Sequence, residues 1–237
     1  MIDGKRILAF IPARGGSKGL PGKNIALLKG RPLAEWTIGQ ALSCPGFDDV
    51  LVSTDDPRIA EVATLAGAQV PFLRPAELAQ DSSPVVEAVE HALEFLASRG
   101  KTFDVVALLE VTSPLRRPGE LQQALQTLVD SWNEIDGVVS LGRIQLESPF
   151  LARTVDGGKI SNLLQPTGYQ RQQLPTTYFP YGVIYAAKTD ALVRERTFHV
   201  ARAAPHFIER WQNYEIDDEC DFACVQAIAA SRKEMSP

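Results

Sequence analysis

The sequence of 237 residues is poor in the features that mark several large classes of protein. Its three cysteines, Cys44, Cys220 and Cys224, have no metal-binding spacing and cannot all pair, which favours a reducing, cytoplasmic location. No apolar run is long enough to cross a membrane. The first residues also lack the order of charged, apolar and small segments that a signal peptide has. We therefore expect no membrane partner.

The chain also has no excess of basic over acidic residues. The net charge is -5 and no long basic run occurs, which argues against nucleic acid as the main partner, because phosphate backbones bind basic faces. No Gly-x-Ser-x-Gly motif or Cys/His pair indicates hydrolase chemistry. The hydrophobic fraction of 45% is ordinary for a globular chain, and the length suits one α/β domain over residues 1–237.

What the sequence does contain is a regular alternation of apolar runs and amphipathic stretches. We predict strands at residues 6–11, 50–53, 70–73, 103–109, 137–141, 181–187 and 214–217, and helices at residues 31–43, 57–67, 82–100, 118–132 and 218–231. This alternation predicts a three-layer α/β fold with a mostly parallel sheet. Because ligands bind at the carboxyl ends of such strands, the segments that follow strands should meet at one edge: residues 11–24, 54–55 and 112–117.

Residues 142–179 interrupt the alternation. They contain two adjacent glycines, three prolines and a polar run at residues 169–173. Apolar side chains such as Ile160 and Leu163 make the segment too apolar for a simple linker. We interpret it as an inserted extension that carries a hairpin, and we expect it to pack on a second subunit.

The densest chemical signal is the loop at residues 11–24, which follows the first predicted strand. It holds four glycines together with Arg14, Lys18 and Lys23. Glycine allows close backbone approach to a ligand, and clustered N–H groups and cations bind polyanions. The spacing fits neither a dinucleotide fingerprint nor a Walker loop, which requires Ser or Thr where Asn24 stands. It fits a nucleotidyltransferase triphosphate loop; the alternative is an ordinary glycine-rich turn.

Several segments carry a family resemblance in the same order along the chain. Residues 11–24 resemble the signature of the acylneuraminate cytidylyltransferases, also called CMP-sialic acid synthetases. The further segments that are similar to motifs of that family are residues 52–55, 73–79, 81–82, 112–116, 171–175 and 215–217. Together these segments span almost the whole chain.

The resemblance implies a Rossmann-like nucleotidyltransferase fold, a homodimer and a Mg²⁺-dependent transfer of CMP from CTP to a nine-carbon 2-keto sugar acid, a nonulosonic acid, with release of pyrophosphate. Such catalysis depends mainly on positioning and charge stabilisation. The residues expected to bind the nucleotide are Arg14, Gly15, Gly16, Ser17, Lys23, Asn24, Arg74 and Ser82. Those expected to be catalytic are Arg14, Lys23 and Asp217.

Some of these assignments have structural alternatives. Arg74 would otherwise be a surface arginine that caps the next helix, and Ser82 an ordinary helix start. Asp55 is better explained as a helix cap than as a metal or ribose ligand.

Two acidic residues are the expected Mg²⁺ ligands. Glu215 and Asp217 alternate along an extended segment, so their side chains point to the same face. One or two carboxylates suffice, because Mg²⁺ usually keeps several waters. The family often has Asp where Glu215 stands, so Asp217 is the better ligand of the two. The alternative is a helix cap beside a solvated acid.

Among the residues expected at the sugar, some depart from the family pattern. The expected set is Glu110, Thr112, Ser113, Arg171, Gln172 and Tyr181, of which Arg171 is expected to pair with the sugar carboxylate. The family commonly has Gln where Glu110 stands, and an acid beside an acidic substrate requires a donor group such as an amide. Legionaminate and 3-deoxy-manno-octulosonate are therefore alternatives to N-acetylneuraminate as the acceptor. Outside enzymes, the alternative is a non-catalytic nucleotide-binding module.

Overall fold

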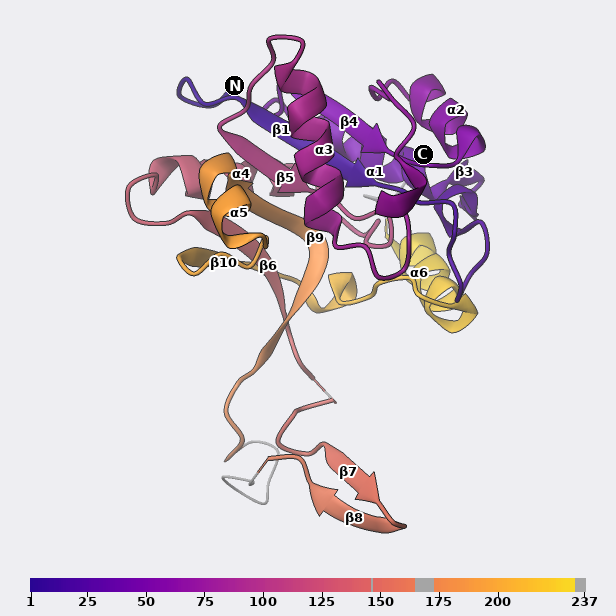
Figure 1. Cartoon of the computed structure of the whole chain (residues 1–237). Helices are drawn as coiled ribbons and strands as arrows, with labels where there is room; N and C mark the ends of the chain where they lie inside the picture. The colour runs from indigo at the N-terminus through magenta and orange to yellow at the C-terminus, as the bar shows by residue number, and fades with distance from the viewer. Residues whose placement is uncertain (146, 165–172, 233–237) are drawn as a thin grey trace.

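The computed structural model describes residues 1–145, 147–164 and 173–232, and its centre is a six-stranded sheet in the order β10-β6-β9-β5-β1-β4 (Figure 1). The strands are β1 (Ile7–Pro12), β4 (Asp49–Ser53), β5 (Val105–Leu108), β6 (Gly137–Arg143), β9 (Tyr178–Lys188) and β10 (Ala203–Ile208). β1 is parallel to β4 and β5, and β6 is parallel to β10. Only β9 among these strands runs antiparallel to its neighbours. The predicted mostly parallel sheet is therefore confirmed.

Helices cover both faces of the sheet. They are α1 (Leu33–Leu42), α2 (Pro57–Leu65), α3 (Val85–Ala97), α4 (Glu120–Asp130), α5 (Thr189–Glu195) and α6 (Glu219–Ser231). Short elements connect them: η1 (Lys23–Ile25), β2 (Leu27–Leu28), β3 (Arg31–Pro32), η2 (Ala76–Leu78) and η4 (Arg210–Gln212). None of the helices in the described part of the chain is both long and apolar enough to span a bilayer.

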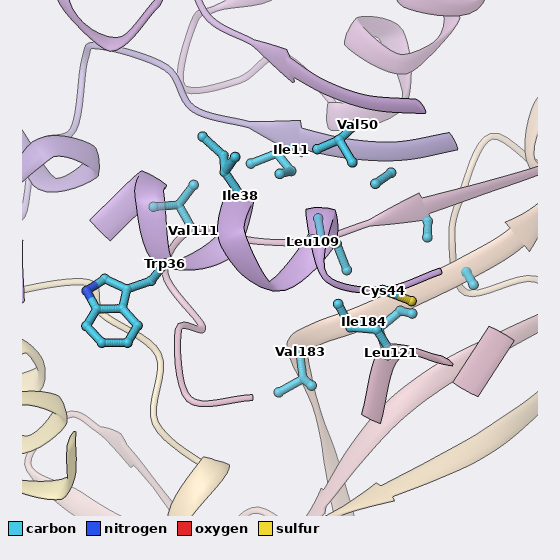
Figure 2. Close-up of a cluster of buried hydrophobic side chains, with 14 of the residues drawn as sticks. Ile11, Trp36, Ile38, Cys44, Val50, Leu109, Val111, Leu121, Val183 and Ile184 are labelled. Atoms are coloured by element: carbon cyan, nitrogen blue, oxygen red, sulfur yellow. The ribbon is translucent and has the colours of Figure 1, made fainter. Parts of the chain in front are cut away.

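Alternating side chains of β1 explain why its sequence is apolar throughout. Ile7 and Ile11 pack into a cluster with side chains of α1, α2, α4 and α6, part of which is seen in Figure 2. Leu8 and Phe10 belong to a second cluster, formed with α3 and α5. Because helices cover both faces of the sheet, both sets of β1 side chains are buried and apolar. The predicted three-layer fold is therefore confirmed.

Two capped helices place acidic residues at the edge of the sheet. Asp56 caps α2 and accepts a 2.8 Å hydrogen bond from the backbone N–H of Arg58. Asp218 and Asp221 form a capping box at the start of α6. Asp217 therefore lies immediately outside α6, in a bend that precedes the helix.

Four details of the predicted order of elements are wrong. Residues 70–73 and 214–217 are not strands, and Gln69 makes only an isolated bridge to Leu51. Neither α5 nor β10 was predicted from the sequence. β10 contains Pro205, which interrupts a strand pattern but is tolerated because β10 lies at the edge of the sheet.

The inserted extension projects from the body of the molecule. β6 and β9 lead away from the sheet toward an antiparallel hairpin of β7 (Arg153–Asp156) and β8 (Lys159–Asn162), which lies apart from the rest of the fold (Figure 1). Val155 and Ile160 pair across this hairpin, and each is 72% exposed. The hairpin thus presents apolar side chains that the body of this chain does not cover.

Candidate active site

A cavity of about 520 Å³ lies at the carboxyl ends of β1 and β5. It is lined by Pro12, Arg14, Ser17, Lys18, Gly19, Lys23, Asn24, Arg74, Leu78, Gln80, Asp81, Ser83, Val85, Glu110, Val111, Thr112 and Asp217. We call it the loop cavity, because residues 11–24 supply much of its wall. The expected meeting of the loops that follow β1 and β5 is confirmed.

Three contacts fix the backbone of the glycine-rich loop. Asp55, which follows β4, accepts a 2.9 Å hydrogen bond from the backbone N–H of Gly15. The side-chain amide of Asn24 donates to the carbonyl oxygen of Arg14 at 2.8 Å. Gly19 lies so close to the carbonyl oxygen of Asp217 that a Cβ would collide with it. The loop is thereby held against both the sheet and the start of α6.

Each cation of the loop is paired with a carboxylate at the cavity. Asp81 accepts hydrogen bonds from both Arg14 and Lys18, and these two partners lower the pKa of the Asp81 carboxyl below its usual range. Lys23 donates to the carbonyl oxygen of Ile216 at 2.6 Å and lies 3.3 Å from a carboxylate oxygen of Asp217. The side chains of Asp81 and Asp217 are 40% and 87% exposed, so both carboxylates are accessible to a ligand in the cavity.

Arg74 is a buried cation of the loop cavity. Its Nε donates to the hydroxyl of Ser53 at 2.9 Å, and its Nη2 donates to the carbonyl oxygen of the same residue. Burial lowers the pKa of Arg74 to about 10, which still leaves it charged at neutral pH. The backbone N–H of Arg74 also donates to Thr54 at 2.7 Å. These contacts orient the guanidinium and differ from the helix-capping alternative.

Glu110 follows β5 and brings an acid into the loop cavity. Its carboxylate accepts a 3.2 Å hydrogen bond from the hydroxyl of Thr112. Burial, reinforced by the negative charge of Glu215, raises the pKa of the Glu110 carboxyl. Glu110 also packs on Gly182 of β9, where an added Cβ would lie 2.8 Å from its side chain. A buried carboxyl of this kind favours a ligand group that forms a hydrogen bond with it.

Tyr181 lines a second cavity, of about 430 Å³, at the base of the extension. This Tyr181 cavity is lined by Arg143, Ile144, Gln145, Glu147, Phe179, Tyr181, Arg210, Asn213 and Tyr214. The rings of Phe179 and Tyr181 meet edge to face with centroids 5.2 Å apart. The cavity combines these aromatic walls with charged and amide side chains, which suits an organic ligand that bears polar groups.

Glu215 and Asp217 have different surroundings in the structure. Asp217 lines the loop cavity, whereas Oε1 of Glu215 accepts hydrogen bonds from the hydroxyl of Ser113, at 2.8 Å, and from the backbone N–H of Gly182. Among the described residues, no three His, Cys, Asp or Glu side chains are grouped so that they could hold a metal ion. A bound cation would therefore depend on Asp217 and on ligand or water oxygens.

The structure brings together about half of the predicted site residues. Those that line the loop cavity are Arg14, Ser17, Lys23, Asn24, Arg74, Glu110, Thr112 and Asp217. Those that do not line it are Gly15, Gly16, Ser82, Ser113 and Glu215, and Tyr181 faces the other cavity. Arg171 and Gln172 lie outside the described residues.

Sequence reasoning left out several side chains of the loop cavity, notably Gln80, Asp81 and Ser83. Asp81 is the most informative of them, because it neutralises two loop cations at once. A polar run between two helices gives no sign of which residue turns inward. The excess of cations in the loop was the available signal that a carboxylate would face it.

Comparison with known proteins decides the family. The family model described as "Cytidylyltransferase" matches residues 8–232. The chain belongs to the cytidylyltransferase family. This confirms the predicted enzyme class, a nucleotidyltransferase, and the resemblance noted in the sequence.

Relatives with named functions match most of the chain. A "CMP-N,N'-diacetyllegionaminic acid synthase" of Legionella pneumophila is 35% identical over 97% of this chain and 98% of its own length. An "N-acylneuraminate cytidylyltransferase" of Escherichia coli is 32% identical over 94% of this chain. The chain spans only 52% of that second relative, so it corresponds to about half of such longer proteins.

Solved structures share the fold. A "CMP:2-keto-3-deoxy-manno-octonic acid synthetase" complexed with CTP aligns with a TM-score of 0.70, covering 95% of this chain and 99% of the other. The sequence identity is 20%, so this likeness establishes the architecture and no more. The predicted Rossmann-like nucleotidyltransferase fold is confirmed.

Proposed function

We propose that this chain transfers CMP from CTP to the anomeric hydroxyl of a nonulosonic acid and releases pyrophosphate. The observation that carries the proposal is the convergence of Arg14, Lys18 and Lys23 on one cavity that also presents the exposed carboxylate of Asp217. The named functions of the Legionella and E. coli relatives support this choice of substrates.

The triphosphate replaces the Asp81 carboxylate, which neutralises Arg14 and Lys18. Its oxygens compete with Asp81 for Arg14 and Lys18, while the contact of Lys23 with Ile216 keeps that ammonium group in place. Attack on the α-phosphate places charge on the phosphoryl oxygens and on the departing pyrophosphate. Fixed cations and loop N–H groups stabilise that charge more than they stabilise the ground state.

Arg74 and Ser82 are assigned to the base and ribose of CTP. The guanidinium of Arg74 lines the loop cavity and is held by Ser53, so it can act as a fixed donor. Ser82 is exposed beside Ser83, which does line the cavity. The contribution of Ser82 is therefore expected to be smaller than that of Arg74.

Mg²⁺ is the proposed cofactor, and Asp217 is the residue that would hold it. An exposed carboxylate that lines the loop cavity suits an ion whose other ligands are waters and phosphate oxygens. When bound, the ion neutralises phosphate charge. Lys23, beside Asp217, orients the carboxylate and shares the same phosphate region.

The acceptor acid is proposed to contact Glu110, Thr112 and Ser113 near the loop cavity and Tyr181 in the second cavity. The carboxyl of Glu110 suits an N–H or O–H donor, such as the amide of an acylamino sugar. Arg171 and Gln172 are assigned to the acceptor carboxylate from the family resemblance. These contacts favour an acid that bears amide substituents.

We further propose a homodimer in the cytoplasm, built through the extension. Apolar side chains exposed on or beside the extension are Leu151, Val155, Ile160, Leu163, Leu164, Tyr178 and Phe179. Covering such a surface with a second copy removes apolar area from water. Sedimentation should show a dimer, and replacing Val155 and Ile160 with Asp should yield monomers.

The test of the function is pyrophosphate release over a matrix of nucleotides and acids. CTP, UTP, GTP and dTTP are each combined with N-acetylneuraminate, N,N'-diacetyllegionaminate, pseudaminate and 3-deoxy-manno-octulosonate. Release is expected with CTP and one or more of the nine-carbon acids, and Asp217→Ala should lower it by about three orders of magnitude. CTP binding without release by any of these acids would instead support a binding module.

A further inference from the structure

Gly182 lies between the two cavities, and hydrogen bonds hold both its backbone N–H and its carbonyl oxygen. Its backbone N–H donates to Glu215, and its carbonyl oxygen accepts from Arg116 at 2.9 Å and from the backbone N–H of Glu110 at 3.2 Å. Glu110, which lines the loop cavity, packs on its Cα, and Tyr181, which lines the second cavity, precedes it. We call these residues the Gly182 wall.

Arg116 has a full set of partners in this wall. A guanidinium has five N–H donors. Two of the contacts go to Thr37 and Gln40 of α1, at 3.1 Å each. The remaining contacts go to backbone carbonyl oxygens, those of Glu110 at 2.8 Å, Gly182 at 2.9 Å and Val183 at 2.7 Å. With 2% of its surface exposed, Arg116 serves the scaffold and has no donor left for a substrate.

Glu215 completes the wall on the opposite side of Gly182, at its backbone N–H. Its Oε1 accepts from Gly182 and from Ser113, so that both lone pairs of this oxygen are used. Its side chain is not among those that line the loop cavity, whereas Asp217, two residues later, is. A Mg²⁺ ion bound to phosphates in the loop cavity would meet Asp217 and not Glu215.

We propose that Glu215 is a positioning residue rather than a metal ligand: together with Arg116 it fixes the two peptide groups that flank the Gly182 Cα, and through them the placement of Glu110 and Tyr181 toward the acceptor. The acceptor part rests on the proposed function. A glutamine can accept the same two hydrogen bonds through its amide oxygen, but it is a much poorer ligand for Mg²⁺. Glu215→Gln and Glu215→Ala therefore separate the two roles.

Metal binding gives the first test and requires no acceptor. Mn²⁺ is titrated into protein with CTP, and free Mn²⁺ is measured by electron paramagnetic resonance. Mn²⁺ affinity is expected to stay within about twofold of wild type in Glu215→Gln and to fall by about tenfold or more in Asp217→Asn. An equal loss in both variants would overturn the proposal.

Amide hydrogen exchange gives the second test and requires no ligand at all. The Gly182 amide should exchange about tenfold faster in Glu215→Ala and at the wild-type rate in Glu215→Gln. Ser113→Ala is the matched control: it removes the other hydrogen bond to Glu215, leaves the Gly182 contact in place and should keep the wild-type exchange rate of the Gly182 amide. If Glu215→Ala does not fold, Glu215→Gln is compared with Ser113→Ala. An unchanged Gly182 amide in Glu215→Ala, or in its absence a loss of protection in Glu215→Gln, would overturn the proposal.

Steady-state kinetics gives the third test. Glu215→Ala should raise KM for the acceptor by about tenfold while KM for CTP changes by less than about twofold, and Glu215→Gln should restore the acceptor KM. If the wild-type protein releases no pyrophosphate with any acid, the proposed function fails, yet the Mn²⁺ and exchange tests still decide the role of Glu215. Equal kinetic defects in the two Glu215 variants would contradict the positioning role.

Discussion

Arg14 and Arg116 show two ways in which this chain uses an arginine. Arg14 is partly exposed, and its partner Asp81 is an exposed carboxylate at the loop cavity. Arg116 is buried, and its partners are backbone carbonyl oxygens and side chains of α1. A polyanion can take the place of Asp81 as the partner of Arg14. The partners of Arg116 belong to the buried scaffold, so a ligand cannot replace them unless the protein unfolds locally.

The difference separates the part of the site that binds from the part that positions. Lys18 and Lys23 resemble Arg14, because each is paired with a carboxylate at the loop cavity. Arg74 lies between the extremes: it is buried and held by Ser53, yet it lines the loop cavity. An arginine or lysine of the binding kind reaches the loop cavity, whereas Arg116 has all its donors on the scaffold.

The largest expected effects come from replacing each arginine with methionine. Arg14→Met should lower kcat/KM for CTP by roughly 100- to 1,000-fold, because a donor to developing charge is lost. Its free energy of unfolding should change by less than about 1 kcal/mol, since an exposed ion pair contributes little.

Arg116→Met should do the reverse and lower the free energy of unfolding by about 3 kcal/mol or more, because several buried carbonyl oxygens lose their donor. Urea unfolding measures both variants. Similar free energies of unfolding for Arg14→Met and Arg116→Met would contradict the assignment of Arg14 to ligand binding and of Arg116 to the scaffold.

A smaller effect is expected at Gly19, where the loop touches the segment before α6. Gly19→Ala forces the loop away from the carbonyl oxygen of Asp217 and should lower kcat/KM for CTP by about 100-fold, the cost of a shift of about 1 Å. Gly39→Ala in α1 is the matched control, because an added Cβ at Gly39 meets no atom within 4 Å. Equal activities of the two variants would show that the loop adjusts freely.

Gly182→Ala tests the positioning part of the site. The added methyl would lie 2.8 Å from the side chain of Glu110, so that side chain must move. KM for the acceptor should rise by about tenfold, whereas CTP binding should change by less than about twofold. Calorimetric titration with CTP and kinetics with the acceptor measure the two quantities. If Gly182→Ala lowered the affinity for CTP and left KM for the acceptor unchanged, Gly182 would belong to the part of the site that binds CTP.

The smallest expected effect is a gain of affinity at Asp81. Asp81→Asn removes the anion that competes with phosphate for Arg14 and Lys18, so pyrophosphate should bind about threefold more tightly at low salt. Asp190→Asn, far along the sequence in α5, is the control for a change of net charge alone. Weaker binding in Asp81→Asn would mean that Asp81 orients the loop cations rather than competing for them.

Local patterns in the sequence predicted the main strands, the helices and the phosphate-binding loop, because each depends on neighbours along the chain. Pro205 concealed β10, whose edge position is known only once the sheet is assembled. The family resemblance of residues 215–217 implied a pair of metal ligands, and no signal in the sequence indicated that Ser113 and Gly182 donate hydrogen bonds to Glu215. Such partners are distant in sequence, so a linear pattern cannot indicate them.

The most direct test of the account follows the α-phosphate of CTP. Protein is incubated with Mg²⁺, an amide-bearing nonulosonic acid and CTP labelled with ³²P at the α-phosphate, and the products are separated. The account predicts that the label moves into a CMP-linked sugar acid in step with pyrophosphate release, and that Asp217→Asn nearly abolishes this transfer. Label that stays in CTP, or that appears only as free CMP, with every acid of the panel would contradict it.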